Sequence, residues 1–366
     1  MEDLLIITES GQLLYSWHRE GNITDDDLIS GFLTALNTFA THERGEDITS
    51  LKLRETTLIF EKVEDYQTKL VFVITTKDEE LINLLHTFVH EIIDMFSEMF
   101  KDLLNKEFNG NVTKYRSFSE ELNKLIINYG LDVLDDYINQ IDEISNLKSV
   151  TFLNPENGQI LYLYSKQYLN KENLSYLVPL VQKSADMFFN SSFDEKIDQI
   201  SIETIRTERL VLEKRKKILI IIQYKYNKNY ESQYISLDLI KNEEKYVKNK
   251  KKLTKIFESV IWDDNVKQIY LIDLLGEVIF KKITENSLNY QEYIPAIISF
   301  ITSSKKLSEG VYNHNLFYCS IKGAKIVTFI SLNFNRFFLI LYSEYQNIRD
   351  FQSIQSLCLN IVNQLK

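Results

Sequence analysis

Residues 4–20 read LLIITESGQLLYSWHRE, two apolar runs on either side of a polar break that contains Gly11. A glycine in such a break can adopt positive φ, as the turn of an antiparallel hairpin requires. Two further stretches have the same shape: SVTFLNPENGQILYLYS (residues 149–165, turning at Gly158) and QIYLIDLLGEVIFKKI (residues 268–283, turning at Gly276). The three hairpins predict a chain of three repeated units.

A helix and three strands are predicted after each hairpin. In the first unit the helix follows a cap at Thr24, and strands are predicted over 48–55, 56–63 and 68–75, before a second helix. The last strand begins at Leu70, Leu219 and Phe337, at nearly the same distance after the hairpin glycine in each unit. Such regular spacing without matching side chains is typical of repeated folds. Each unit is therefore predicted to be α+β, with a five-stranded antiparallel sheet packed by helices in the order ββαβββα.

The chain of 366 residues is long enough for several domains with cores of their own. We predict a first domain over residues 1–130, a helical connector over 131–146, a second domain over 147–264 and a third over 265–366. The first 146 residues carry 12 basic and 29 acidic side chains, a net charge of −17, whereas 147–265 carry +4 and 266–366 carry +3. This asymmetry either keeps the protein soluble, which we favour, or steers a partner.

The composition predicts a soluble cytoplasmic protein. The sequence begins Met-Glu-Asp without the basic and apolar regions of a secretory signal, and its apolar runs are strand-length. Cys319 and Cys358 are the only cysteines, which suits a reducing compartment. We interpret both as buried, inert thiols rather than nucleophiles, because no base is identifiable beside either.

The threefold ββαβββα plan resembles the longin domain, and the related roadblock domain shares much of that topology. The resemblance is carried by the hairpins at Gly11, Gly158 and Gly276 and by the apolar fifth strands, and it covers nearly the whole chain. Three longin-like units in one chain look like the tri-longin proteins. The resemblance implies paired subunits that dock through longin surfaces and act on a small Ras-like GTPase, commonly as a nucleotide exchange factor.

The function predicted on this basis is a non-enzymatic platform that binds and regulates a small GTPase as an exchange-factor subunit, and that forms a homodimer or a heterodimer with another longin or roadblock protein. One alternative is a structural adaptor of a membrane-trafficking or tethering complex without exchange activity. Another is a small-molecule sensor, which a ligand-sized apolar cavity would support. By analogy with the family, the predicted GTPase-facing surface lies on the first helix and comprises Asp25, Asp26, Asp27, Asn37 and His42.

No phosphate-binding GxxxxGK[ST] loop occurs in the sequence, and we predict no enzyme activity, cofactor or metal. The spacing of His86, His90 and Asp94 places them on one face of a predicted helix. They could present three ligands to a metal, but we favour a polar stripe that faces solvent.

Two basic clusters lie in the second unit. They comprise Lys214, Arg215, Lys216 and Lys217, and Lys248, Lys250, Lys251 and Lys252. Such clusters either contact an anionic membrane peripherally or are solvated surface, and the second interpretation is favoured. Nucleic acid is not a predicted partner, because the chain is acidic overall and shows no nucleic-acid-binding module.

The third unit is lightly charged and rich in aromatic side chains. An excess of such residues marks a permanent partner surface, and an open antiparallel sheet can offer its edge strand to another chain. We therefore predict a dimer that forms through the third unit.

Overall fold

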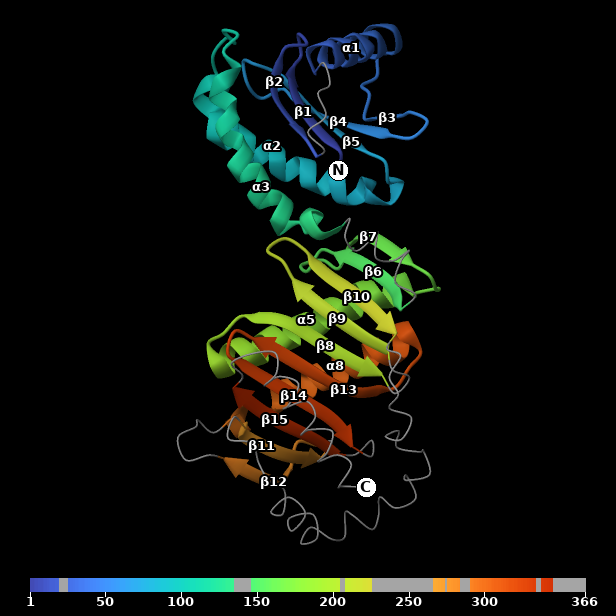
Figure 1. The fold of residues 1–366 in the computed structure, drawn as a ribbon, viewed down its shortest axis with the longest axis vertical. Coiled ribbons are helices and arrows are strands. Elements are labelled where there is room, and N and C mark those ends of the chain that lie inside the picture. The colour runs from blue at the N-terminus through green and yellow to red at the C-terminus, as the bar shows by residue number, and fades with distance from the viewer. Residues whose placement is uncertain are drawn as a thin grey trace. The chain divides into compact units, whose positions relative to one another are not determined.

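The computed structural model describes residues 1–19, 26–134, 146–204, 208–225, 266–273, 275–283, 290–333 and 337–344. In these residues the strands form two antiparallel sheets, one of five strands and one of ten, with helices packed on them (Figure 1). The predicted α+β class is confirmed. The chain divides into two compact units, of which the first is built mainly from Met1–Ile138 and the second contains most of the rest.

The first repeat contains the five-stranded sheet, whose strand order is β2-β1-β5-β4-β3. Its strands are β1 (Asp3–Thr8), β2 (Leu13–His18), β3 (Ser50–Lys52), β4 (Thr57–Val63) and β5 (Leu70–Thr76). The apolar strands β1 and β5 lie next to each other, with Leu5 opposite Val73. Strand β3 ends the sheet and is much shorter than the predicted 48–55, because the chain turns after it and Leu53 N–H donates to Thr56 O at 2.8 Å.

Helix α1 (Asp26–Phe39) covers one face of this sheet, and its last turn continues as a π-helical segment, η1 (Ala40–Arg44). Because side chains alternate along a strand, every second strand residue points to α1. The core on this face consists of Leu5, Ile7, Leu33, Leu58, Phe60, Val71 and Val73. The Ser30 hydroxyl donates to Gly11 O at 3.1 Å, which ties the helix to the hairpin turn.

The opposite face of the sheet is covered by α2 (Ile82–Leu104) and α3 (Phe118–Asn128), which follow the short 3-10 segments η2 (Glu79–Leu81) and η3 (Val112–Ser117) (Figure 1). Asp78 accepts a hydrogen bond from Glu80 N–H at 2.9 Å and so caps the start of η2, which leads into α2. The Phe96 ring contacts Phe72 of β5 edge to face, with ring centroids 5.8 Å apart. Phe96 and Phe100 of α2 are buried between the helix and its neighbours, whereas Met99 on the same helix is 40% exposed.

The second and third repeats share the ten-stranded sheet, of order β12-β11-β15-β14-β13-β8-β9-β10-β6-β7. The second repeat contributes β6 (Leu147–Leu153), β7 (Ile160–Ser165), β8 (Ile197–Thr204), β9 (Glu208–Lys214) and β10 (Leu219–Lys225). The third contributes β11 (Val266–Asp273), β12 (Val278–Ile283), β13 (Leu316–Gly323), β14 (Ile326–Asn333) and β15 (Phe337–Glu344). In each half the strands of the repeat lie in the order second, first, fifth, fourth and third, which is the order of the first sheet.

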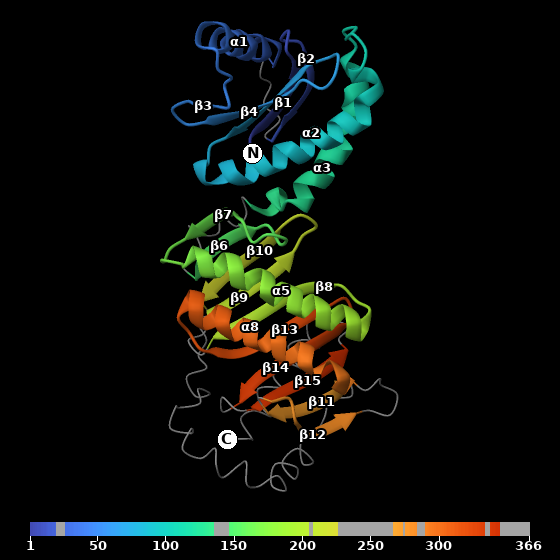
Figure 2. The same ribbon diagram turned by 180° about the vertical axis from the view of Figure 1, so that it is seen from behind.

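The two halves of the large sheet meet at β8 and β13, which pair antiparallel with Ser201 opposite Ser320. Helices α5 (Lys171–Phe193) and α8 (Ile294–Tyr312), the latter preceded by the 3-10 segment η5 (Tyr290–Tyr293), lie side by side on one face of this sheet (Figure 2). Strand β13 of the third repeat is thus paired within its own chain, and β12 is the strand of this repeat that lies at an edge of the sheet. A dimer through the third unit stays a prediction, but it cannot use β13 as a free edge.

The ββαβββ order is confirmed in all three repeats. The three hairpin glycines have positive φ, with values of 90° at Gly11, 77° at Gly158 and 86° at Gly276. Most of the connector (135–145), together with residues 226–265 and 345–366, lies outside the described residues. The domain boundaries at 130, 146 and 264 stay predictions. No helix in the described ranges has both the length and the apolar character needed to cross a membrane.

Candidate interaction surface

Helix α1 is apolar on both of its faces. Leu33 packs into the core beneath the helix, but three large apolar side chains point away from the sheet and are exposed by 70% (Leu28), 62% (Phe32) and 59% (Phe39). Residues 28–41 contain no charged side chain. An exposed apolar stripe on a helix is typical of a surface that binds another protein.

Strand β3 lies at the edge of the five-stranded sheet. In the described part of the chain β3 is paired on one side only, with β4, where Ser50 is opposite Ile59. Leu53, directly after β3, is 50% exposed. An edge strand presents backbone N–H and C=O groups that can pair with another chain. We call Leu28, Phe32, Phe39, Leu53 and the edge of β3 the open surface of the first repeat.

The predicted GTPase-facing residues are in different environments. Asp27 and His42 are exposed near the two ends of α1, as the prediction requires. Asn37 is only 8% exposed and lies on the inner side of the helix, so its assignment to a surface was wrong. Helical phase explains this, since Asn37 is one turn beyond the buried Leu33. Asp25 lies outside the described residues, and binding by the others stays a prediction.

Asp26 forms part of an ion-pair cluster that joins three elements. Its carboxylate contacts Nε2 of His18 at 3.0 Å, and Asp3 contacts Nδ1 of the same ring at 2.8 Å. Burial acts to lower the pKa of His18, but the hydrogen bonds and negative charges of Asp3 and Asp26 together outweigh burial and raise it above the usual value. Asp26 therefore fastens α1 to the β1–β2 hairpin.

Replacing His18 by glutamine is expected to destabilise the protein more in mild acid than in mild alkali. Because the folded state raises the pKa of His18, its stabilisation is fully present below the pKa of the unfolded chain and disappears as the pH rises through the folded pKa. We expect the losses in unfolding free energy to differ by about 1 kcal/mol between about pH 5.5 and about pH 8.5. Urea titrations at both pH values measure this difference, and equal losses would contradict the assignment.

The basic cluster at the β9–β10 turn is only partly available. Lys214 contacts Asp186 at 2.8 Å, Arg215 and Lys217 are half-buried, and Lys216 is exposed. The other predicted residues, Lys248, Lys250, Lys251 and Lys252, lie outside the described residues. Peripheral membrane contact therefore stays a prediction.

The residues considered as metal ligands do not form a cluster. His86 contacts Glu61 of β4 through Nδ1 at 3.2 Å. Across the described ranges, no three His, Cys, Asp or Glu side chains are grouped so that they could hold a metal ion. The buried position predicted for Cys319 is confirmed, and burial raises the pKa of its thiol well above the usual range. Cys358 lies outside the described residues.

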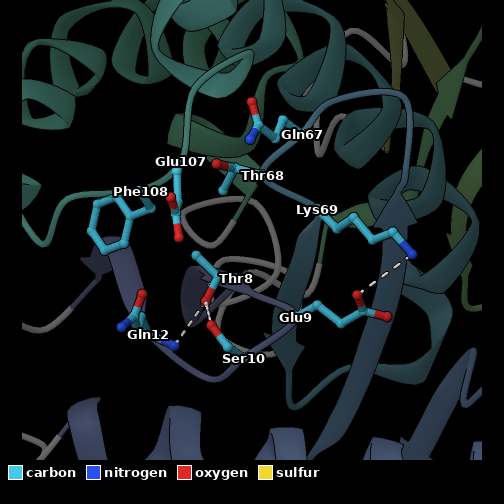
Figure 3. A pocket seen from close by; sticks show the side chains of 9 residues that line it. All are labelled: Thr8, Glu9, Ser10, Gln12, Gln67, Thr68, Lys69, Glu107 and Phe108. Carbon is cyan, nitrogen blue, oxygen red and sulfur yellow. Dashed lines mark hydrogen bonds and ion pairs between the residues drawn. The ribbon is translucent and has the colours of Figure 1, made fainter.

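A pocket of about 560 Å³ lies at the β1–β2 turn of the first repeat (Figure 3). Its walls are Thr8, Glu9, Ser10, Gln12, Gln67, Thr68, Lys69, Glu107 and Phe108. Several of these polar groups bind one another, since Lys69 contacts Glu9 at 3.6 Å and the Thr8 and Ser10 hydroxyls are 2.9 Å apart. A small-molecule sensor was expected to enclose an apolar cavity, and this polar pocket does not have that character.

Two solved structures show limited similarity to this chain. MglB from Myxococcus xanthus is 14% identical, with a TM-score of 0.26, over 33% of this chain and 93% of its own. An uncharacterized protein from Mycobacterium tuberculosis is 9% identical, with a TM-score of 0.14, over 96% of this chain and 99% of its own. At these TM-scores neither similarity establishes a common fold, so the fold description rests on this chain's own strand order. No family model and no curated protein matches the chain.

Proposed function

We propose that the chain is a non-enzymatic platform of longin-like repeats that binds and regulates a small Ras-like GTPase as an exchange-factor subunit. The proposal is supported by the ββαβββ order of all three repeats, the order that the longin resemblance implies. The observation that carries it is the open surface of the first repeat. The corresponding helices and edge strands of the other two repeats contact each other, so the first repeat is the one with such a surface exposed in the described part of the chain.

In this proposal two exposed polar residues, Asp27 in the first turn of α1 and His42 in η1, contact the GTPase beside the apolar stripe. Exchange would follow from contacts with the GTPase switch segments that open its nucleotide and Mg²⁺ site. The energy for this step comes from binding the open state of the GTPase more tightly than the closed state. No group of this chain needs to form a covalent bond.

Affinity capture from native lysate tests the proposal. The protein is used as bait with EDTA and, in parallel, with Mg²⁺ and a non-hydrolysable GTP analogue, and captured GTPases are identified by mass spectrometry. We expect one small GTPase to be enriched with EDTA, because an exchange factor prefers the nucleotide-free state. The Asp27→Lys, His42→Glu variant should lose it, whereas Lys216→Glu, a charge reversal at an exposed residue of the β9–β10 turn, should retain it.

Two other results would overturn parts of the proposal. Enrichment only with the GTP analogue would make the chain an effector rather than an exchange factor. Capture of proteins other than GTPases in both conditions would replace the proposal with the structural-adaptor alternative.

A further inference from the structure

We propose that the polar pocket at the β1–β2 turn of the first repeat (Figure 3) binds a small organic cation that carries a guanidinium group. None of the residues that line this pocket belongs to the open surface, and neither Asp27 nor His42 lines it. The inference therefore goes beyond GTPase binding and concerns a separate site on the same repeat.

Three segments of the chain form the walls of the pocket. They are the β1–β2 turn, the segment directly before β5 and the segment that follows α2. Glu9 N–H donates to Lys69 O at 3.0 Å, which joins the first segment to the second. Thr68 joins the second segment to the third, since its N–H donates to Leu104 O at 2.9 Å and its hydroxyl to Lys106 O at 2.8 Å. Because the walls are fastened together without a ligand, binding would cost little ordering of the chain.

The β1–β2 turn keeps its shape through hydrogen bonds of its own. The hydroxyls of Thr8 and Ser10 are 2.9 Å apart, and Gln12 N–H donates to the Thr8 hydroxyl oxygen at 3.0 Å. Thr8 is buried, with 4% of its surface exposed. This wall of the pocket is therefore preformed, and its hydroxyl oxygens can accept hydrogen bonds from a ligand.

Three other side chains in the walls are available to a ligand. The Glu107 carboxylate and the side-chain amides of Gln12 and Gln67 make neither a hydrogen bond nor an ion pair with any residue that the structure describes. In Figure 3 the Glu107 carboxylate points from its own segment toward the β1–β2 turn. A ligand that bonds to these groups would break no contact in the described part of the protein.

The charges of the pocket favour a cation. Lys69 contacts Glu9 at 3.6 Å, so these two charges largely offset each other. The charge of Glu107 has no such counterpart among the described residues. Its surroundings have the same sign, since the first 146 residues carry a net charge of −17. A cation would therefore be drawn to the pocket, whereas a phosphate or another anion would be repelled.

A guanidinium group matches these side chains better than an ammonium group does. Because it is planar, it can stack on the ring of Phe108 while it donates two parallel hydrogen bonds to the carboxylate of the neighbouring Glu107. It has five N–H donors and no acceptor. The amide oxygens of Gln12 and Gln67 would accept the remaining N–H groups, and the walls therefore supply the acceptors that this cation needs.

Free arginine and the arginine side chain of a peptide both carry this group. A volume of about 560 Å³ is in the range of sites for small molecules. The exposed Glu9–Lys69 pair offers one charge of each sign, which would suit the α-ammonium and α-carboxylate groups of free arginine. An arginine within a peptide has neither charge, so the two sources can be told apart by experiment.

Saturation-transfer NMR titrations of L-arginine with the purified full chain test the inference. Because Glu107 is exposed, we expect weak binding, with a Kd of about 0.1–1 mM. Citrulline is the matched control ligand, since an uncharged urea group replaces the guanidinium group. It should bind at least about tenfold more weakly. Arginine blocked at both its amino and carboxyl groups is titrated in parallel. If it binds as well as arginine, the ligand is a peptide side chain, and if it binds more weakly, the ligand is the free amino acid; both results support a guanidinium site.

Variants of the walls locate the site. Glu107→Gln should weaken arginine binding by about tenfold or more, and Phe108→Leu by about threefold. Glu98→Gln makes the same change at an exposed residue of α2 outside the pocket, and it should leave the affinity unchanged.

Three results would each overturn the inference. They are the absence of arginine binding up to about 10 mM, equal affinities for arginine and citrulline, and arginine binding that Glu107→Gln leaves unchanged. None of these results bears on GTPase capture, so this test and that of the proposed function fail separately.

Discussion

Replacing Arg209 by alanine is expected to lower the unfolding free energy of the second compact unit by about 3–5 kcal/mol. Arg209 on β9 contacts Glu203 of β8 through Nη2 at 2.6 Å and through Nε at 3.0 Å, and it donates to the Tyr318 hydroxyl of β13 at 3.0 Å. Its side chain therefore spans the junction between the second and third repeats. Without it Glu203, which is 6% exposed, would keep a buried negative charge that has lost its nearest cation.

Urea denaturation followed by circular dichroism measures this loss. Adding Glu203→Gln to Arg209→Ala should recover part of the stability, because the buried charge is then removed together with its partner. Lys214→Met is the matched control, since it breaks an exposed ion pair with Asp186 and should cost less than about 1 kcal/mol. A loss for Arg209→Ala no larger than that of Lys214→Met would show that the junction does not depend on this contact.

Replacing Phe96 by alanine is expected to destabilise the first compact unit by about 3–5 kcal/mol. The ring is fully buried and lies at the centre of an aromatic cluster. Its centroid is 5.8 Å from that of Phe72 on β5, 5.6 Å from that of Tyr115 and 5.1 Å from that of Phe118 at the start of α3. Removing it would leave a cavity that joins α2, α3 and the sheet, and a cavity of that size cannot close by small shifts.

Thermal and urea unfolding of the full chain measure the effect of Phe96→Ala. The control is Met99→Ala on the same helix, where the side chain is 40% exposed and the loss should be below about 1 kcal/mol. If both variants lose the same amount of stability, the orientation of α2 on the sheet would be contradicted.

The hairpin turns and the order of helices and strands in each repeat could be predicted from the sequence, because they depend on residues that are close together in the chain. Glycine is the residue that reaches positive φ without strain, and the three hairpins turn at Gly11, Gly158 and Gly276 as predicted. The pairing of β8 with β13 was not predicted, because strands so distant in sequence show no local sign of which edge they join. The same property hid the difference between the repeats, since β8 pairs with β13 whereas the three-residue β3 has β4 as its described partner.

The candidate surface was predicted in part. Asp27 and His42 are exposed, but Asn37 lies on the buried side, and counting helical turns from Leu33 would have shown this. Leu28, Phe32 and Phe39 were missed, although a signal was present. A surface helix normally carries charge on its outer face, and residues 28–41 carry none. An uncharged outer face with large apolar side chains is typical of a surface that binds another molecule.

The second and third repeats pair within one chain through β8 and β13. Hydrogen–deuterium exchange with mass spectrometry tests it most directly, because an edge strand exchanges its amides quickly and an internal strand slowly. We expect peptides covering Ile197–Thr204 and Leu316–Gly323 to exchange slowly, and we expect dilution to leave their protection unchanged. Fast exchange in either peptide, or protection that disappears on dilution, would show that these strands do not pair within the chain.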